Sequence, residues 1–228
     1  MIAKLYYSNF LKCSRTDDTS ISHDSECNLL KLTVGTIGGQ ERESFDVTVC
    51  TPDWLARHVA KNGPELGRYH LIVEYMSTKV ARAFTSERIK RQQADDWPTL
   101  VNRLSRMGRP SSAHELSGKM AAVVKSAFLI EGERLDRGAF WLRLLVGPHG
   151  GRGEESFDVC VCTTDWLKGQ VSSQGPMFGR HHLIVNRLNI DQATDFLRNV
   201  IENKRAQTWT ELATELGEIG AWEFEDYD

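Results

Sequence analysis

The sequence predicts an α+β fold built as two tandem homologous domains, each a small, mainly antiparallel sheet with two or three helices packed on it. The first observation is a repeat, because the segment from Glu43 to Leu55 returns almost unchanged as Glu155 to Leu167. At the same offset, roughly two positions in five are identical over about 80 residues. The second is that strand-like alternation and helix-like spacing follow each other in the same order in both halves. A repeat this long has room for its own core, so each copy should be a domain.

Length and composition set the domain plan. The chain has 228 residues, 40% of them hydrophobic and 26% charged, and no apolar run long enough to cross a bilayer. We expect a first domain at 1–108, a polar linker at 109–118 and a second domain at 119–228. The N-terminus lacks the features of a secretory signal, and an odd number of cysteines, five, suits a reducing compartment. We therefore expect a cytoplasmic protein that makes no membrane contact.

The net charge of -3 conceals a difference between the halves. Residues 1–112 carry 16 Lys and Arg against 13 Asp and Glu, whereas residues 113–228 carry 12 against 18. The second half is therefore the acidic one. Solvated surface is the simpler explanation, and a patch that attracts a basic partner is the functional one.

Each repeat is expected to alternate strands and helices in the same order. Leu30, Leu32 and Val34 alternate with polar residues, as in a strand with one buried face. Glycine-rich turns at 35–39 and 147–153 lead into a strand rather than a helix, which favours hairpins over phosphate-binding loops. The expected strands are 2–7, 30–34, 45–50 and 69–75 in the first repeat, and 120–124, 141–146, 157–162 and 181–185 in the second.

Helical spacing marks the candidates for the two or three helices expected in each repeat. Thr51 and Pro52 provide a cap and a first-turn proline, and Thr163 begins the equivalent helix. The helices of the first repeat are 51–61, 77–92 and 97–104, and those of the second begin at 163, 190 and 209. Exposed basic residues on 77–92 leave open a nucleic-acid-binding module as an alternative, although this helix lacks interleaved aromatic residues.

No catalytic, cofactor or metal site is predicted. Cys13, His23, Asp24 and Cys27 fall in a polar loop, but their spacing fits no common metal site. Cys160 and Cys162 are two apart in a strand and are expected to be small buried residues.

A hydrolase remains a further alternative. His70 or His182 would act with Asp46 or Asp158, but no nucleophile motif frames these residues. We therefore expect the two histidines to be strand residues.

The chain ends with alternating aromatic and acidic residues from Ala221 to Asp228. This pattern predicts a strand with Trp222 and Phe224 inward and Glu223 and Glu225 outward, followed by an exposed acidic end. Such a surface could also contact a basic partner.

These motifs together resemble the immunity protein 8 family of bacterial polymorphic toxin systems. The resemblance rests on Glu-Ser-Phe-Asp-Val, Cys-Thr-Pro-Asp-Trp-Leu, Gly-Arg-x-His-Leu-Ile-Val and the closing Gly-x-Trp-Glu-Phe-Glu-Asp-Tyr. It covers essentially the whole chain as two copies. The first copy departs from the pattern after Gly108, where Arg109 and Pro110 replace the closing motif.

The resemblance implies a non-enzymatic antitoxin that binds a cognate toxin domain stoichiometrically and neutralises it. We expect the acidic end of the second domain to meet a basic toxin surface, and nucleic acid to be the leading target of such a toxin. Neither a cofactor nor direct binding of nucleic acid is expected; the alternative is a nucleic-acid-binding or scaffold module without a toxin partner. The expected contact residues are Glu223, Glu225, Asp226, Tyr227 and Asp228.

Overall fold

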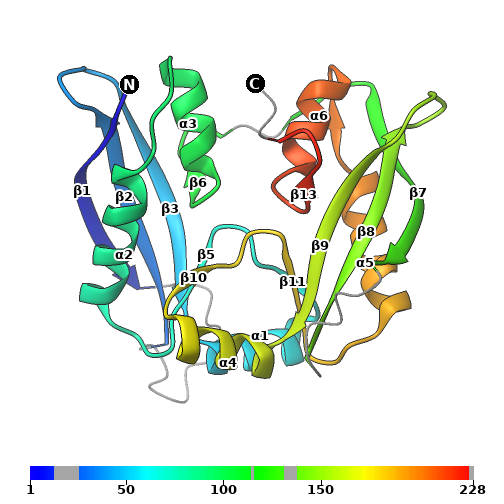
Figure 1. Ribbon diagram of the computed structural model, residues 1–228, viewed down its shortest axis with the longest axis horizontal. Helices are drawn as coiled ribbons and strands as arrows, with labels where there is room; N and C mark the ends of the chain where they lie inside the picture. Colours follow the sequence, from blue (N-terminus) through cyan, green and yellow to red (C-terminus); the bar gives the residue numbers. More distant parts are fainter. Residues whose placement is uncertain (13–25, 114–115, 131–137, 226–228) are drawn as a thin grey trace. The chain divides into compact units, whose positions relative to one another are not determined.

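A computed structural model describes residues 1–12, 26–113, 116–130 and 138–225. Both repeats form the same series of elements, except that the second has an additional short strand, β12 (Arg205–Ala206), between its last two helices (Figure 1). The first contains β1 (Ala3–Lys12), β2 (Cys27–Thr36), β3 (Arg42–Cys50), α1 (Pro52–Asn62), β4 (Glu65–Leu66), β5 (His70–Ile72), α2 (Thr78–Lys90), α3 (Trp97–Ser105) and β6 (Arg109–Pro110). The second contains β7 (Met120–Leu129), β8 (Ala139–Pro148), β9 (Glu155–Thr163), α4 (Thr164–Gln174), β10 (Met177–Phe178), β11 (His182–Val185), α5 (Ile190–Glu202), β12 (Arg205–Ala206), α6 (Trp209–Leu216) and β13 (Ala221–Trp222).

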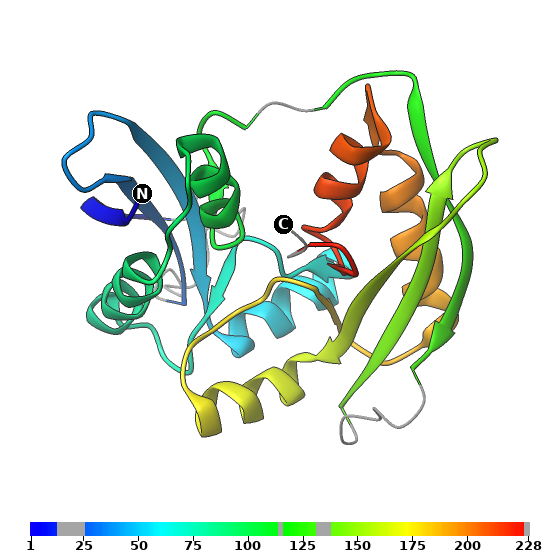
Figure 2. The same ribbon diagram turned by 45° about the horizontal axis from the view of Figure 1, so that its top comes forward.

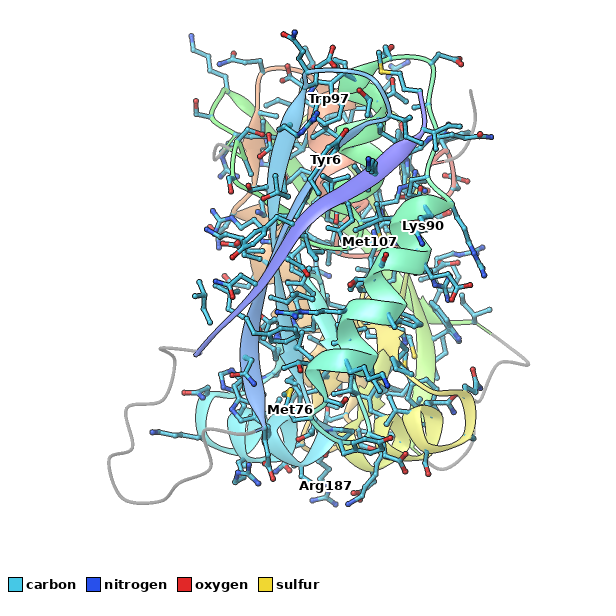
Figure 3. The ribbon with its side chains drawn as sticks, turned by 90° about the vertical axis from the view of Figure 1, so that its left-hand side faces the viewer. Tyr6, Met76, Lys90, Trp97, Met107 and Arg187 are labelled. Carbon is cyan, nitrogen blue, oxygen red and sulfur yellow. The ribbon has the colours of Figure 1, made fainter. Side chains whose placement is uncertain are left out.

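The sheet of the first compact unit has the strand order β1-β2-β3-β5-β10, with β6 also pairing with β3. β1, β2 and β3 form an antiparallel meander, and β5 runs parallel to β3. The alternating residues Leu30, Leu32 and Val34 of β2 are buried, as their spacing predicts. Helices α2 and α3 cover this face, and α2 runs alongside β1 (Figure 3).

The sheet of the second unit has the order β12-β7-β8-β9-β11-β4, with β13 pairing with β9. Helices α5 and α6 lie on one face of β7, β8 and β9 (Figure 2). Leu197 and Ile201 of α5 are four residues apart, as are Leu212 and Leu216 of α6. These buried side chains share one core with Leu142 and Leu144 of β8, among others. The α+β fold in tandem domains is therefore confirmed.

Each compact unit contains a segment from the other repeat. Unit 1 consists of Met1–Leu55, Arg68–Ala113 and Lys168–Gly179, and unit 2 of Ala56–Gly67, His114–Leu167 and Arg180–Asp228. The exchanged segments carry the short strands β4 and β10. Along the sequence, the segment 109–118 predicted as a linker begins with strand β6.

Two details of the predicted elements are corrected. Cys27 belongs to β2 and is buried rather than lying in the polar loop, because it pairs directly with Cys50 of β3. The closing strand ends at Trp222, so Phe224 is exposed and the side chain of Glu225 is largely buried. The inward and outward alternation fails there because the chain turns after Trp222 and the two-residue period of a strand no longer applies.

None of the helices in the described part of the chain is long and apolar enough to cross a membrane.

Candidate functional site

The C-terminal segment of the second repeat is fastened to β9. Strand β13 pairs antiparallel with β9, with Ala221 opposite Asp158 and Trp222 opposite Phe157. The Trp222 ring stacks on Phe157 at a centroid distance of 6.3 Å, and Phe224 meets Trp222 edge-on at 6.0 Å. Gly220 precedes this strand at a point where an added Cβ would lie 3.0–3.1 Å from side-chain atoms of Val159 and Phe157. Backbone pairing and ring contacts therefore hold the closing segment against β9.

Glu155 joins two tryptophans from different elements. Its Oε1 accepts a hydrogen bond from Trp209 Nε1, and its Oε2 accepts one from Trp222 Nε1, both at 2.7 Å. A carboxylate that accepts two indole N–H groups satisfies both donors as they become half-buried. This pairing ties the start of α6 to the closing strand.

Arg180 is the centre of a second polar cluster. Its guanidinium pairs with Glu225, donates to the carbonyl of Gly217 at 3.0 Å and lies 3.6 Å from Glu218. The side chains of Arg180 and Glu225 are only 13% and 16% exposed, so solvent screens this pair weakly. His181 adds a hydrogen bond at 2.9 Å to the same carbonyl of Gly217.

The structure therefore separates the predicted contact residues. Glu225 is committed to Arg180, whereas Glu223 is exposed although its Oε1 accepts from the backbone N–H of Ser156 at 2.7 Å. Phe224 lies between them with 46% of its surface exposed. Asp226, Tyr227 and Asp228 lie outside the described residues.

The first repeat keeps the closing strand but changes its side chains. Strand β6 pairs with β3, and Pro110 occupies the place opposite Phe45 that Trp222 occupies opposite Phe157. Ser111 N–H donates to the carbonyl of Ser44 at 2.7 Å, as Glu223 N–H does to Ser156 at 3.2 Å. The backbone plan is thus common to both repeats, while the aromatic and acidic side chains belong to the second.

The two histidines singled out by the sequence have the same local role. Nδ1 of His70 contacts the carbonyl of Arg68 at 3.0 Å, and Nδ1 of His182 contacts that of Arg180 at 2.8 Å. A carbonyl oxygen only accepts, so Nδ1 carries the proton in each case. Both contacts fix the turn that precedes a strand, which supports a structural assignment for these side chains.

The carboxylates considered as their partners are ion-paired on the sheets. Asp158 forms a bidentate pair with Arg143, at 2.7 Å to Nε and 2.6 Å to Nη2, and this raises the pKa of Arg143. Asp46 lies 3.6 Å from Lys31 in the equivalent place. Both pairs join neighbouring antiparallel strands.

The cysteines of the described segments are buried, and those segments contain no group of three or more metal-binding side chains. Burial, followed by the hydrogen bond that the Cys162 thiol donates to Cys160, raises the pKa of Cys162, so its thiol stays protonated at neutral pH. Cys13, His23 and Asp24 of the polar loop lie outside the described residues.

Helix α2 and its C-cap Arg91 carry five exposed cationic side chains, but three of them make contacts within the chain. Arg82 lies over the ring of Phe10 and Arg88 over that of Phe84, while Arg91 pairs with Glu87. These contacts are those of a solvated helix face. The five residues are Lys79, Arg82, Arg88, Lys90 and Arg91.

Comparison with protein families gives the same match for both repeats. The model of the family described as Immunity protein 8 matches residues 11–109 and again residues 126–227. The chain belongs to this family. The chain therefore contains two Immunity protein 8 regions in tandem. Membership of the family implies an immunity protein with a cognate toxin as its partner. The comparison with curated proteins gave no match, and the comparison with solved structures also gave none.

The matched regions reflect the difference between the two copies. The first match ends at residue 109, where the side chains of the closing segment diverge, and the second continues to residue 227 through the closing motif. Sequence reasoning identified that motif but missed the residues that hold it, Glu155, Arg180 and Glu218. Glu155 recurs as Glu43 and Arg180 as Arg68, so their identity in both repeats could have marked them as candidates. Glu218 has Arg106 at the equivalent position, and the repeat gives no such indication for it.

Proposed function

We propose that this chain is a cytoplasmic antitoxin of a polymorphic toxin or secretion-system effector, and that it protects the cell in interbacterial competition by binding the toxin stoichiometrically. The observation that carries the proposal is the match of an immunity protein family to both repeats. Inhibition by binding needs shape and charge complementarity rather than a catalytic group.

The closing segment of the second unit is the proposed contact surface. Glu223 and Phe224 are exposed there on a backbone that β9 holds in place, which combines a charge with an aromatic anchor. We include Asp226, Tyr227 and Asp228 in the contact because they continue this segment. Glu225 is proposed to act by holding the segment through Arg180.

The partner surface is proposed to be basic. Six more acidic than basic residues in the second half favour a cationic partner, and a toxin that acts on nucleic acid needs a cationic cleft for its substrate. Glu223 and the terminal carboxylates would cover such a surface and compete with phosphate groups.

The first test is capture of the toxin. The tagged full chain is used as bait in extracts of its source cell, with mass spectrometry of what co-purifies in moderate salt. An effector toxin domain recovered at equal stoichiometry, and inhibited by the purified chain, supports the proposal. Recovery of nucleic acid, with salt-sensitive binding to bare DNA or RNA, would instead support the nucleic-acid-binding alternative.

The contact surface is tested separately with the captured toxin. Glu223→Gln and Asp228→Asn should lower the association rate several-fold at low salt and less at high salt, because exposed charges mainly steer association. Asp191→Asn on α5 is the matched control, since it removes an exposed carboxylate of the same unit at another place. Equal association rates for all three variants and the parent would exclude this surface.

A further inference from the structure

The edges of both sheets show how one repeat recognises another. Arm 1 denotes residues 56–67 and arm 2 residues 168–179, the segments that the compact units exchange. We infer that strands β5 and β11 are binding edges for the arm of a second repeat, so that the two repeats hold each other non-covalently and the linker is not what keeps them together.

Arm 1 completes the sheet of unit 2. Its strand β4 pairs antiparallel with β11, with Leu66 opposite Leu183. Gly67 N–H donates to the carbonyl of His182 at 2.8 Å. The Leu66 side chain packs against the core of unit 2, so the arm adds apolar contact as well as backbone hydrogen bonds.

Arm 2 completes the sheet of unit 1 in the same way (Figure 1). Strand β10 pairs with β5, with Phe178 opposite Leu71, and Gly179 N–H donates to the carbonyl of His70 at 2.9 Å. The Phe178 ring lies 5.6 Å from that of Phe84. Two polar contacts extend the attachment: Lys168 Nζ to Asp53 Oδ1 at 2.9 Å, and Ser172 Oγ to Glu74 Oε1 at 2.8 Å.

The two pairings are equivalent under the repeat. Leu66 corresponds to Phe178 and Leu183 to Leu71, so each repeat gives the other the contact that it receives. Reciprocal contacts of this kind characterise an isologous interface, and exchange of identical elements characterises a segment-swapped pair. The partner that these edges fit is therefore another repeat of the same fold.

Backbone conformation at the two ends of each arm is also shared. Gly63 and Gly175 end α1 and α4 with φ of 87° and 83°. Tyr69 and His181 follow the arms with φ of 64° and 62°, values that non-glycine residues rarely adopt. The chain therefore enters and leaves arm 1 and arm 2 with the same backbone conformations.

Disulfide trapping in the full chain tests the inference. A protease site is placed at residues 114–115, cysteine pairs are introduced, and the chain is oxidised and then cut. Hydrogen bonding at Gly67 and His182 makes the next pair, Leu66 and Leu183, a close non-hydrogen-bonded pair that suits a cross-strand disulfide. Leu66→Cys with Leu183→Cys should leave the cut halves joined on a non-reducing gel, with the linkage assigned by peptide mapping.

The control places the second cysteine on the strand of the same repeat. Leu66→Cys with Leu71→Cys would form a disulfide only if arm 1 folded back onto its own β5, and we expect no such linkage. Its formation, without the Leu66–Leu183 linkage, would overturn the inference.

The chain without added cysteines gives an independent reading. After the cut, the two fragments should elute together as one particle of the parent mass in native buffer and separate only under denaturing conditions. Elution as two folded halves that each retain the parent's circular dichroism would also overturn the inference. Phe178→Asp in arm 2 should weaken this co-elution of the fragments, whereas Ile37→Asp, which introduces the same charge at a 64% exposed residue outside the arms, should leave it unchanged.

Discussion

Trp222 donates its indole N–H to Oε2 of Glu155 at 2.7 Å. The two residues are 67 positions apart, and the contact places an aromatic residue of the closing segment against the strand that begins the repeated motif. In the first repeat Glu43 is retained, while Pro110 stands at the position of Trp222. The carboxylate therefore has a partner in the second unit that the first cannot supply, although the closing strand exists in both.

Replacing Glu155 should destabilise the second unit. Glu155→Ala removes the acceptor of two half-buried indole groups, and we expect the free energy of unfolding to fall by about 1–3 kcal/mol. Chemical denaturation followed by tryptophan fluorescence measures it. Glu43→Ala is the matched control, because Glu43 accepts from backbone N–H groups of Ser44 and Ser112 instead. An equal or larger loss in Glu43→Ala would contradict the role given to the indole contacts.

The two closing glutamates should differ in what they control. Glu225→Gln removes the charge that faces the largely buried Arg180, and about 1–3 kcal/mol of stability should be lost. Glu223→Gln makes the same charge change at an exposed side chain, so its cost should be below about 1 kcal/mol. Urea denaturation of both variants measures these two losses of stability. The reverse order of stabilities would show that the Arg180 cluster does not hold the segment.

Two glycines of α4 and its end should respond oppositely to alanine. A Cβ added at Gly169 or at Gly175 would meet no atom within 4 Å. Neither alanine would therefore clash, and the effect of each on stability depends on the backbone conformation at that position. Gly175 has φ of 83°, and Gly175→Ala should cost about 1–2 kcal/mol. Gly169 lies inside the helix, where Gly169→Ala should add about 0.5–1 kcal/mol. Thermal unfolding of both variants tests this, and a loss of stability in Gly169→Ala would refute it.

The N-cap of α3 should make the first unit sensitive to acid. Asp96 accepts a hydrogen bond from Thr99 N–H at 2.8 Å, and this contact lowers the pKa of Asp96 below its ordinary value of 3.8. The pKa of Asp96 is lower in the folded chain than in the unfolded chain. The stability that its hydrogen bond contributes is therefore complete above the unfolded pKa and is lost as pH falls through the folded pKa.

The serine variant isolates this effect. Asp96→Ser keeps a capping oxygen without a titrating group, as Thr208 does at the start of α6. The difference in urea midpoint between parent and variant should be constant from pH 7 to about pH 5. Below about pH 4 the midpoint of the parent should fall relative to that of the variant. A difference that stays constant over the whole range would exclude a contribution from Asp96.

Several elements followed directly from local pattern. The strands around Leu30 and Phe45 and the helices that begin at Pro52 and Trp97 were predictable, because alternation, helical spacing and capping residues act over a few neighbouring positions. The lengthened β1, the strand pairing of Cys27 and the early end of the closing strand were not, since each depends on a partner strand distant in sequence.

By itself the sequence determined the duplication, the order of helices and strands within each copy and the family to which both copies belong. Only the tertiary structure decided that Glu225 turns toward Arg180 while Glu223 remains exposed, and that Leu66 and Phe178 complete the sheets of the opposite repeats. The reason is physical. A two-residue strand has almost no pattern of its own, and which edge it joins depends on hydrogen-bonding groups and apolar surface that the assembled sheet alone presents.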